Sequence, residues 1–336
     1  MFRENEIVIM IGAGCSADAG LSTSKKMVDQ LENLMETKPA WRKYKELYNY
    51  IKSSLLYVKG IRGNFENNID IERLVSALGE LEKKENCILY PFIGNWNTKL
   101  LEIAGYDFGI ISEFRGKIVD QLKTWVQLKD YDKASYYAKF FDFQEAYNYV
   151  LRVFSLNYDL CLEKNNVGGK HLERGFDPAS RIWDSRRFYP AVEEQDLYLY
   201  KLHGSLDWER DEHRGNIVRE VDNIPEVPDL IFGTDFKLYY IDPYLYYASE
   251  FRKYSLEAKI ILIIGYGFND EHINSILKQA LSYDGEKKLY VVDVSTDSVR
   301  RELAVRPEQI ILEKIGAKDF LENVLSTKGL ESVLKK

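Results

Sequence analysis

Short apolar runs that end in turn residues recur along the chain and predict buried strands. The first run covers residues 7–11 and ends at Gly12. Five later runs end in the same way and cover residues 152–159, 196–204, 228–233, 259–267 and 288–295. Short apolar strands that alternate with helices favour a parallel sheet covered on both faces. The pattern therefore predicts an α/β fold with a doubly wound, mainly parallel sheet.

Residues 24–150 show a different pattern, because apolar residues recur there at the three- and four-residue spacing of helices. The clearest helical faces lie in residues 25–35 and 69–85, and the second begins after Asp70, a suitable N-cap. The apolar positions of these two faces are Met27, Val28, Leu31, Leu34, Met35, Ile71, Leu74, Val75, Leu78 and Leu81. The first strand is thus separated from the others by a helical insertion over residues 24–150.

The remaining segments complete the expected organisation. Residues 115–128 and 131–151 predict further helices, whereas the polar, glycine-bearing residues 60–68 predict a loop. We expect one domain over residues 1–336 that contains the helical insertion, and a C-terminal helical tail over residues 296–336.

Composition limits the class of protein and its partners. The 336 residues include 46 basic and 53 acidic side chains, a net charge of −7, without a basic stripe, so nucleic acid is not expected as a direct partner. No apolar run is long enough to span a membrane, and the N-terminus lacks the pattern of a secretory signal. Cys15, Cys87 and Cys161 are too far apart for a disulfide framework or a zinc motif. We expect a cytoplasmic protein without membrane contact and without zinc.

Polar or glycine-rich residues follow each predicted strand, and parallel strands bring such ends to one edge of the sheet. The Gly-Ala-Gly turn at residues 12–14 is either a phosphate-binding turn or a tight connection between strand and helix. Asn157 and Asp159 are either helix caps or site residues, and His203 is either structural or catalytic. The last two strands end in Gly265, Gly267, Asn269, Asp270 and Asp293.

In combination these motifs resemble the sirtuin family. The stretches GAGCS, LNYD, LHG, IFGT and GYG occur in that order between residues 7 and 295. Sirtuins bind NAD+ on a Rossmann-like sheet, so the resemblance implies a Rossmann-like fold with NAD+ as the substrate.

The resemblance also implies a role for each matching residue. The pyrophosphate would be held by Gly12, Ala13, Gly14 and Ser16. Asn157 and Asp159 would act near the nicotinamide and its ribose, with His203 as the general base. The adenosine side would be contacted by Gly265, Gly267 and Asn269, and Asp293 would bind the adenine ribose hydroxyls.

The chain departs from protein-deacylating sirtuins in the parts that serve zinc and the acyl-lysine substrate. No cysteine lies between His203 and Gly265, where those enzymes carry four zinc ligands. The Asp-Phe-Arg motif is missing after Gly20, and Leu156 and Thr234 stand where the family has Gln and Glu. This pattern resembles the zinc-free, sirtuin-like branch of bacterial anti-phage defence proteins, which hydrolyse NAD+ and typically carry a helical insertion.

The resemblance implies an NAD+ hydrolase that releases nicotinamide and ADP-ribose as an abortive-infection effector. The nicotinamide nitrogen is already cationic, so nicotinamide leaves without a proton and no general acid is needed. His203 is expected to act as a base that takes a proton from water or a ribose hydroxyl, while Asn157 orients the ribose or the water. Asp159 either stabilises developing positive charge or braces the loop of Asn157. A deacylase or ADP-ribosyltransferase without zinc and a non-catalytic NAD+ or ADP-ribose sensor are the two alternatives.

Control of such an activity is expected to come from assembly. About forty residues follow Asp293, too few for a sensor domain. We therefore expect a homo-oligomer, or a separate regulatory protein such as a hexameric ATPase. The aromatic-rich segments 131–149 and 236–254 either contribute to such an interface, or pack in the core or line the nicotinamide cleft.

Overall fold

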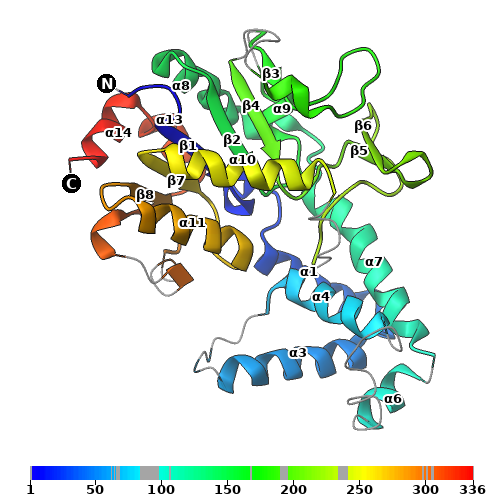
Figure 1. Cartoon of the computed structure of the whole chain (residues 1–336). Helices are drawn as coiled ribbons and strands as arrows, with labels where there is room; N and C mark the ends of the chain where they lie inside the picture. Colours follow the sequence, from blue (N-terminus) through cyan, green and yellow to red (C-terminus); the bar gives the residue numbers. More distant parts are fainter. Residues whose placement is uncertain are drawn as a thin grey trace. The chain divides into compact units, whose positions relative to one another are not determined.

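The structure is a computed structural model that divides into two compact units. It describes residues 2–61, 63, 65, 69–83, 98–105, 107–166, 169–189, 196–233, 241–296, 299, 302–303 and 306–335, so Cys87 and Thr234 lie outside the described residues. The sheet unit comprises Met1–Leu21, Gln127–Leu230 and Lys237–Lys336. The helical unit comprises Ser22–Val126 and Ile231–Phe236 (Figure 1).

A parallel sheet forms the centre of the sheet unit. Its strands are β1 Ile7–Ile11, β2 Leu151–Ser155, β3 Leu172–Glu173, β4 Leu197–Lys201, β7 Ile260–Ile264, β8 Lys288–Val292 and β9 Ile310–Glu313. In the described part of the chain they form one seven-stranded sheet in the order β3-β4-β2-β1-β7-β8-β9, and all its pairings are parallel. The predicted doubly wound, Rossmann-like α/β fold is confirmed.

Helices cover both faces of this sheet, which is why its strands are continuous apolar runs rather than alternating ones. Every residue of β1 and of β7 is buried. One face packs against η3 Tyr131–Ala138, α8 Lys139–Tyr147, α13 Ala317–Asn323 and α14 Thr327–Val333. Helices α10 Tyr244–Glu257 and α11 Glu271–Tyr283 lie across the other face (Figure 1).

The second face of the sheet is lined with aromatic rings. Phe154 of β2 stacks on Tyr200 of β4 with ring centroids 4.4 Å apart, and lies 5.0 Å from the ring of Phe251 in α10. Trp183 donates a hydrogen bond to the hydroxyl of Tyr247, which in turn donates to the carbonyl of Arg174. The polar atoms of Trp183 and Tyr247 thus have partners, which allows these two large rings to pack in the core.

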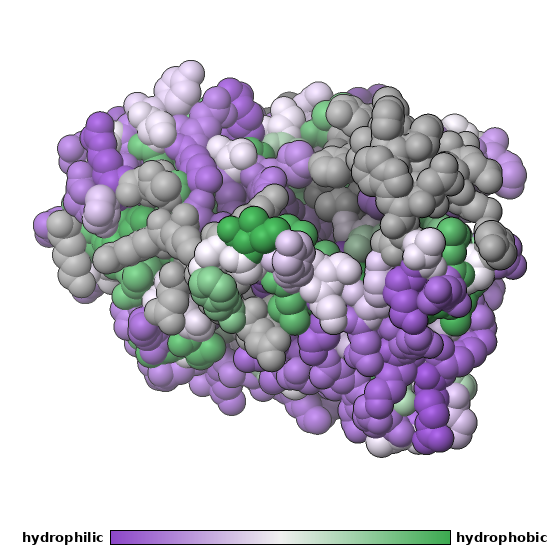
Figure 2. Space-filling view, turned by 90° about the horizontal axis from the view of Figure 1, so that it is seen from below, coloured by the Kyte–Doolittle hydropathy of each residue, from purple (hydrophilic) through white to green (hydrophobic). Residues whose placement is uncertain are grey.

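The two aromatic-rich segments are therefore largely part of the core. Their buried rings are Tyr136, Tyr137, Phe140, Phe141, Phe143, Tyr147, Tyr244, Tyr247, Phe251 and Tyr254. On the face drawn in Figure 2, hydrophilic residues predominate and hydrophobic residues gather in small groups. For these rings the core alternative is confirmed, so they do not support an interface between chains.

The helical unit is built of helices, and those that begin at residues 24, 71 and 109 cover segments that the apolar spacing predicts. The helices are α1 Ser24–Thr37, α2 Pro39–Arg42, α3 Lys45–Ile61, α4 Ile71–Glu82, α6 Thr98–Ala104 and α7 Gly109–Val126. The predicted apolar faces of α1 and α4 are buried, with Leu34 and Leu81 only partly so. Asp70 is the N-cap of α4 and accepts a hydrogen bond from the backbone N–H of Glu72 at 2.7 Å, as predicted. Among the described helices, none combines the length and hydrophobicity that a membrane span requires.

One predicted strand is wrong. Residues 228–233 form no strand of the sheet, and only Leu230 makes an isolated bridge, to Gly204. The reason is that the segment lies against a small antiparallel hairpin, β5 Trp208–Asp211 and β6 Ile217–Glu220. The N–H of Asp229 donates to the carbonyl of Trp208, and its carboxylate pairs with Arg210 at 2.9 Å.

The C-terminal segment and the insertion differ in detail from the expected organisation. Residues 296–336 contain strand β9 as well as helices, and β9 extends the sheet beside β8. Residues 127–150 belong to the sheet unit, where η3 and α8 supply much of the core. The division into one NAD+-binding domain, an insertion over 24–150 and a tail over 296–336 stays a prediction.

Candidate functional site

The register of the sheet aligns the carboxyl ends of five strands. Lys201, Ser155, Ile11, Ile264 and Val292 pair with one another in a single row from β4 to β8. The residues that follow this row directly or at the second position are His203, Asn157, Gly12, Gly265 and Asp293. Five of the predicted site residues therefore lie along one edge of the sheet, where open parallel sheets bind their ligands.

The glycines of this edge bring two backbones into direct contact. A Cβ on Gly12 would lie 2.6 Å from the carbonyl oxygen of Gly265, and a Cβ on Gly14 would lie 2.7 Å from the Cα of Gly265. Gly265 has a φ of +68°, and a Cβ there would lie 2.1 Å from the nitrogen of Cys15. The turns after β1 and β7 thus need all three glycines in order to pack.

Two backbone N–H groups of the turn after β1 donate hydrogen bonds within the protein. The N–H of Gly12 donates to the carbonyl of Ile264 at 2.9 Å, and the N–H of Gly14 donates to that of Gly265 at 2.8 Å. Ala13 is exposed and Gly14 is half-buried. Pyrophosphate binding by Gly12, Ala13, Gly14 and Ser16 stays a prediction, and packing alone accounts for the two glycines.

Asn157 joins the first two strand ends through its side chain. Its Nδ2 donates to the carbonyl of Gly12 at 3.0 Å and to the hydroxyl of Ser16 at 3.2 Å. The residue is buried, yet no hydrogen bond to its Oδ1 is found among the described residues. This oxygen can therefore accept a hydrogen bond from a ribose hydroxyl or a water molecule.

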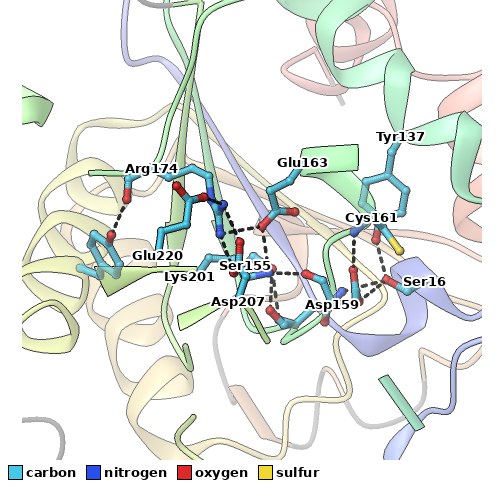
Figure 3. Close-up of polar contacts among 12 residues, drawn as sticks. Ser16, Tyr137, Ser155, Asp159, Cys161, Glu163, Arg174, Lys201, Asp207 and Glu220 are labelled. Atoms are coloured by element: carbon cyan, nitrogen blue, oxygen red, sulfur yellow. Dashed lines mark hydrogen bonds and ion pairs between the residues drawn. The ribbon is translucent and has the colours of Figure 1, made fainter. Parts of the chain in front are cut away.

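The carboxylate of Asp159 accepts two hydrogen bonds close to Asn157. Its Oδ2 accepts from the hydroxyl of Ser16 at 2.7 Å, which is also 2.7 Å from the hydroxyl of Tyr137. Its Oδ1 accepts from the N–H of Cys161, the first residue of α9 Cys161–Lys164. Figure 3 shows Ser16 and Asp159 pointing toward each other. These contacts favour the bracing role for Asp159 over a direct role at the ribose.

A buried network of ion pairs contacts the loop that carries Asn157 and Asp159. The ammonium of Lys201, at the end of β4, bonds the carbonyl of Asp159 and lies 3.3 Å from the carboxylate of Glu163. Arg174 contacts the same carboxylate at 3.4 Å, and it binds both oxygens of Asp207 at 2.9 Å and one of Glu220 (Figure 3).

The charges in this network depend on one another. Burial disfavours the ionised form of Asp207, but the Arg174 guanidinium, together with Ser205 and Lys201, holds the pKa of that carboxyl below its ordinary value. Removal of one partner from such a buried set leaves an uncompensated charge, which typically costs about 3–5 kcal/mol. Lys201 therefore holds the backbone of Asp159 within a group of charges that is difficult to rearrange.

His203 sits in a tight turn after β4. Gly204 follows with a φ of +86°, and a Cβ there would lie 2.1 Å from the carbonyl oxygen of Asp229. This close approach explains the glycine of the Leu-His-Gly stretch. His203 is 5% exposed, and its Nε2 lies 3.2 Å from Oδ2 of Asp270.

Asp270 is the residue that the sequence analysis did not assign to the site. It is the N-cap of α11 and accepts from the N–H groups of His272 and Ile273. Burial disfavours its ionised form, but His203 and these two N–H groups together lower the pKa of its carboxyl. Its position directly before the helical run 271–283, as an aspartate at an N-cap, was the available signal.

The remaining predicted residues follow β7 and β8. Gly267 and Asn269 are exposed in the loop between β7 and α11. Asp293 is the first residue after β8, and its carboxylate accepts from the N–H of Ser295 at 2.8 Å. Burial raises the pKa of the Asp293 carboxyl, and the Ser295 N–H offsets this only in part. Their roles toward adenosine stay predictions.

The described cysteines and histidines show neither a metal site nor a reactive thiol. Among the described residues, no group of three or more His, Cys, Asp or Glu is placed to hold a metal ion. Cys15 and Cys161 are buried, and burial raises the pKa of both thiols. Neither is therefore a thiolate nucleophile at neutral pH.

Comparison with known proteins assigns a class to this part of the chain. Residues 151–316, which run from β2 to the start of the C-terminal helices, match the family model described as SIR2-like domain. This part of the chain is a SIR2-like domain, so the sirtuin-like resemblance is confirmed there. No curated protein sequence matches the chain.

Solved structures of Sir2 homologues are similar to the chain at low identity. A Sir2 homologue in complex with NAD has a TM-score of 0.45 at 12% identity, covering 98% of this chain and 89% of that one. A mutant Sir2 homologue in complex with 2'-O-acetyl-ADP-ribose has the same TM-score and identity, covering 98% and 92%. At this level of likeness the activity of this chain has to be argued from its own site.

The contact between the glycine turns predicts a large difference between two similar substitutions. Gly265→Ala should lower the free energy of unfolding by about 3 kcal/mol or more, because a left-handed φ is strained and the Cβ meets the backbone of Cys15. Gly215→Ala, at a φ of +77° with nothing within 4 Å, should cost only about 1 kcal/mol. Urea unfolding of both variants measures this, and equal costs would contradict the packing argument.

Proposed function

We propose that the protein binds NAD+ at the carboxyl edge of the sheet and hydrolyses its nicotinamide–ribose bond to nicotinamide and ADP-ribose. The observation that carries the proposal is the placement of Asn157 and His203. Each lies two positions beyond the paired residues Ser155 and Lys201. Asn157 contacts the glycine turn after β1, and His203 lies 3.2 Å from Asp270 in the loop after β7. The SIR2-like match and a Sir2 homologue that was solved with NAD support the choice of ligand.

The chemistry needs orientation and a base rather than an acid. The nicotinamide nitrogen is already cationic, so it leaves without a proton, and the enzyme has to stabilise an oxocarbenium-like transition state and deliver water. His203 takes a proton from the water or from a ribose hydroxyl near neutral pH. Asn157 orients that group through its Oδ1, while its Nδ2 is fixed by Gly12 and Ser16. Asp159 positions Ser16 and, through it, Asn157.

We also propose a biological role for this activity. A hydrolase of this kind suits an abortive-infection effector of anti-phage defence, with a homo-oligomer or a separate ATPase as its control. Asp207, Glu220 and the hairpin β5–β6 lie between His203 and β7, in the interval where deacylating sirtuins carry zinc, and Arg174 pairs with both carboxylates. This arrangement supports a domain that is stable without metal.

The first prediction concerns the reaction. Pure protein incubated with NAD+ should release nicotinamide without an acylated peptide. His203→Ala and Asn157→Ala should each lower turnover by about 10²–10⁴-fold, because each removes a group that acts on the water or the ribose. Chromatographic measurement of nicotinamide, with circular dichroism to confirm folding, tests this. His213→Ala, which changes an exposed histidine in the loop between β5 and β6, should retain full turnover.

Other outcomes separate the competing functions. Release that depends on an acylated peptide would point to a deacylase, and ADP-ribose attached to an added protein would point to a transferase. NAD+ binding without release under any assembly state would point to a sensor. Wild-type turnover in either the His203 or the Asn157 variant would show that the site is assigned to the wrong residues.

The second prediction concerns metal. Elemental analysis of the pure protein should find zinc far below one ion per chain, and incubation with a chelator should leave both turnover and thermal unfolding unchanged. The physical reason is that ion pairs and buried aromatic rings hold the region between β4 and β7. One firmly held zinc ion per chain would overturn this view.

A further inference from the structure

The two carboxylate oxygens of Asp270 serve different neighbours. Oδ1 accepts from the backbone N–H groups of His272 and Ile273 at 2.9 and 3.2 Å and so caps α11. Oδ2 lies 3.2 Å from Nε2 of His203, which is an ion-pair distance. Because the cap fixes the rotation of the carboxylate, Oδ2 is held beside this nitrogen of the imidazole.

The loop that carries Asp270 is itself held in place. The hydroxyl of Tyr266 accepts from the N–H of Asp270 at 3.2 Å and lies 3.1 Å from Oδ1 of Asn274. The Asn274 amide donates to the carbonyl of Phe268 at 2.8 Å, where the chain turns with a φ of +59°. These contacts fix the loop independently of His203, so Asp270 can act as a rigid partner for the imidazole.

We propose that Asp270 is a positioning residue that selects the tautomer of His203, because its charge beside Nε2 favours the proton on that nitrogen, and that Nδ1 is the atom that accepts the proton from substrate. In a neutral imidazole one nitrogen carries the proton and the other carries the lone pair. A carboxylate cannot donate when ionised, so it selects the tautomer protonated on Nε2. It also stabilises the imidazolium that forms when Nδ1 takes a proton from water or a ribose hydroxyl.

The expected loss of kcat rests on the proposed function, but the tautomer of His203 can be measured whether or not the protein hydrolyses NAD+. The described groups around the imidazole include the ring of Tyr158, whose centroid lies 6.5 Å away, in addition to Asp270. Asp270 is the described carboxylate that forms an ion pair with His203.

Asp270→Asn is the sharpest variant, because asparagine is also a good N-cap. With its oxygen kept at the backbone N–H groups of α11, the amide would present its NH₂ to Nε2, and His203 would have to carry its proton on Nδ1. We expect a loss of about 10²-fold or more in kcat with KM nearly unchanged. The low-pH limb of the rate profile should also shift to lower pH, because the carboxylate no longer stabilises the imidazolium.

A matched control separates positioning from capping. Asp70 caps α4 through the same contact, to the N–H of Glu72. Asp70→Asn should therefore leave kcat and the pH profile unchanged. Equal kcat and an unshifted profile in Asp270→Asn would show that Asp270 only caps its helix and would overturn the proposal.

Nuclear magnetic resonance of ¹⁵N-histidine-labelled full-length protein tests the tautomer directly. The chain has four histidines, so the His203 signals can be assigned by their loss in His203→Ala. In the wild type we expect protonated Nε2 and unprotonated Nδ1, and the reverse in Asp270→Asn. A wild-type His203 protonated on Nδ1 would refute the inference whether or not the protein hydrolyses NAD+. The expected tautomer without NAD+ turnover would instead count against the proposed function alone.

Discussion

The close approach of the turns after β1 and β7 is the constraint on which the rest of the site depends. Gly12, Gly14 and Gly265 let two backbones meet where side chains would collide. The carbonyl of Gly12 that this contact fixes is the acceptor for the Asn157 amide. The same glycines that a phosphate-binding turn requires are thus already required by packing, and a ligand role would be added to a structural one.

The charges beneath the site follow from the same geometry. Parallel strands end together, so Lys201 ends beside the loop that carries Asn157 and Asp159 and bonds its backbone. A buried ammonium is costly without partners, and Glu163 shares its carboxylate with both Lys201 and Arg174. Arg174 then reaches Asp207 and Glu220 in the hairpin region. Charge pairing therefore links the site loop to the hairpin β5–β6.

The sequence predicted the strands that a local apolar pattern marks, and it did not predict the features that depend on contacts between distant residues. Nearly continuous apolar runs marked β1, β2, β4, β7 and β8, because strands buried on both faces have few polar positions. Residues 228–233 look the same, but the pairing of Asp229 with Arg210 and Trp208 draws them to the hairpin. Strand β9 was missed because its apolar run of Ile310, Ile311 and Leu312 is only three residues long. Strand order and the Asp270 contact likewise depend on tertiary packing.

The aspartates of this edge bind a helix start and a site side chain at the same time. Asp159 uses Oδ1 for the N–H of Cys161 and Oδ2 for Ser16, and Asp270 uses Oδ1 for α11 and Oδ2 for His203. A carboxylate has enough lone pairs for both tasks, and the helix start supplies the fixed N–H groups that set its rotation. Each aspartate thereby converts the rigid start of a helix into the orientation of one polar side chain. An aspartate at the start of a helix after a parallel strand is therefore better examined for what its second oxygen contacts than classed as a cap or a site residue.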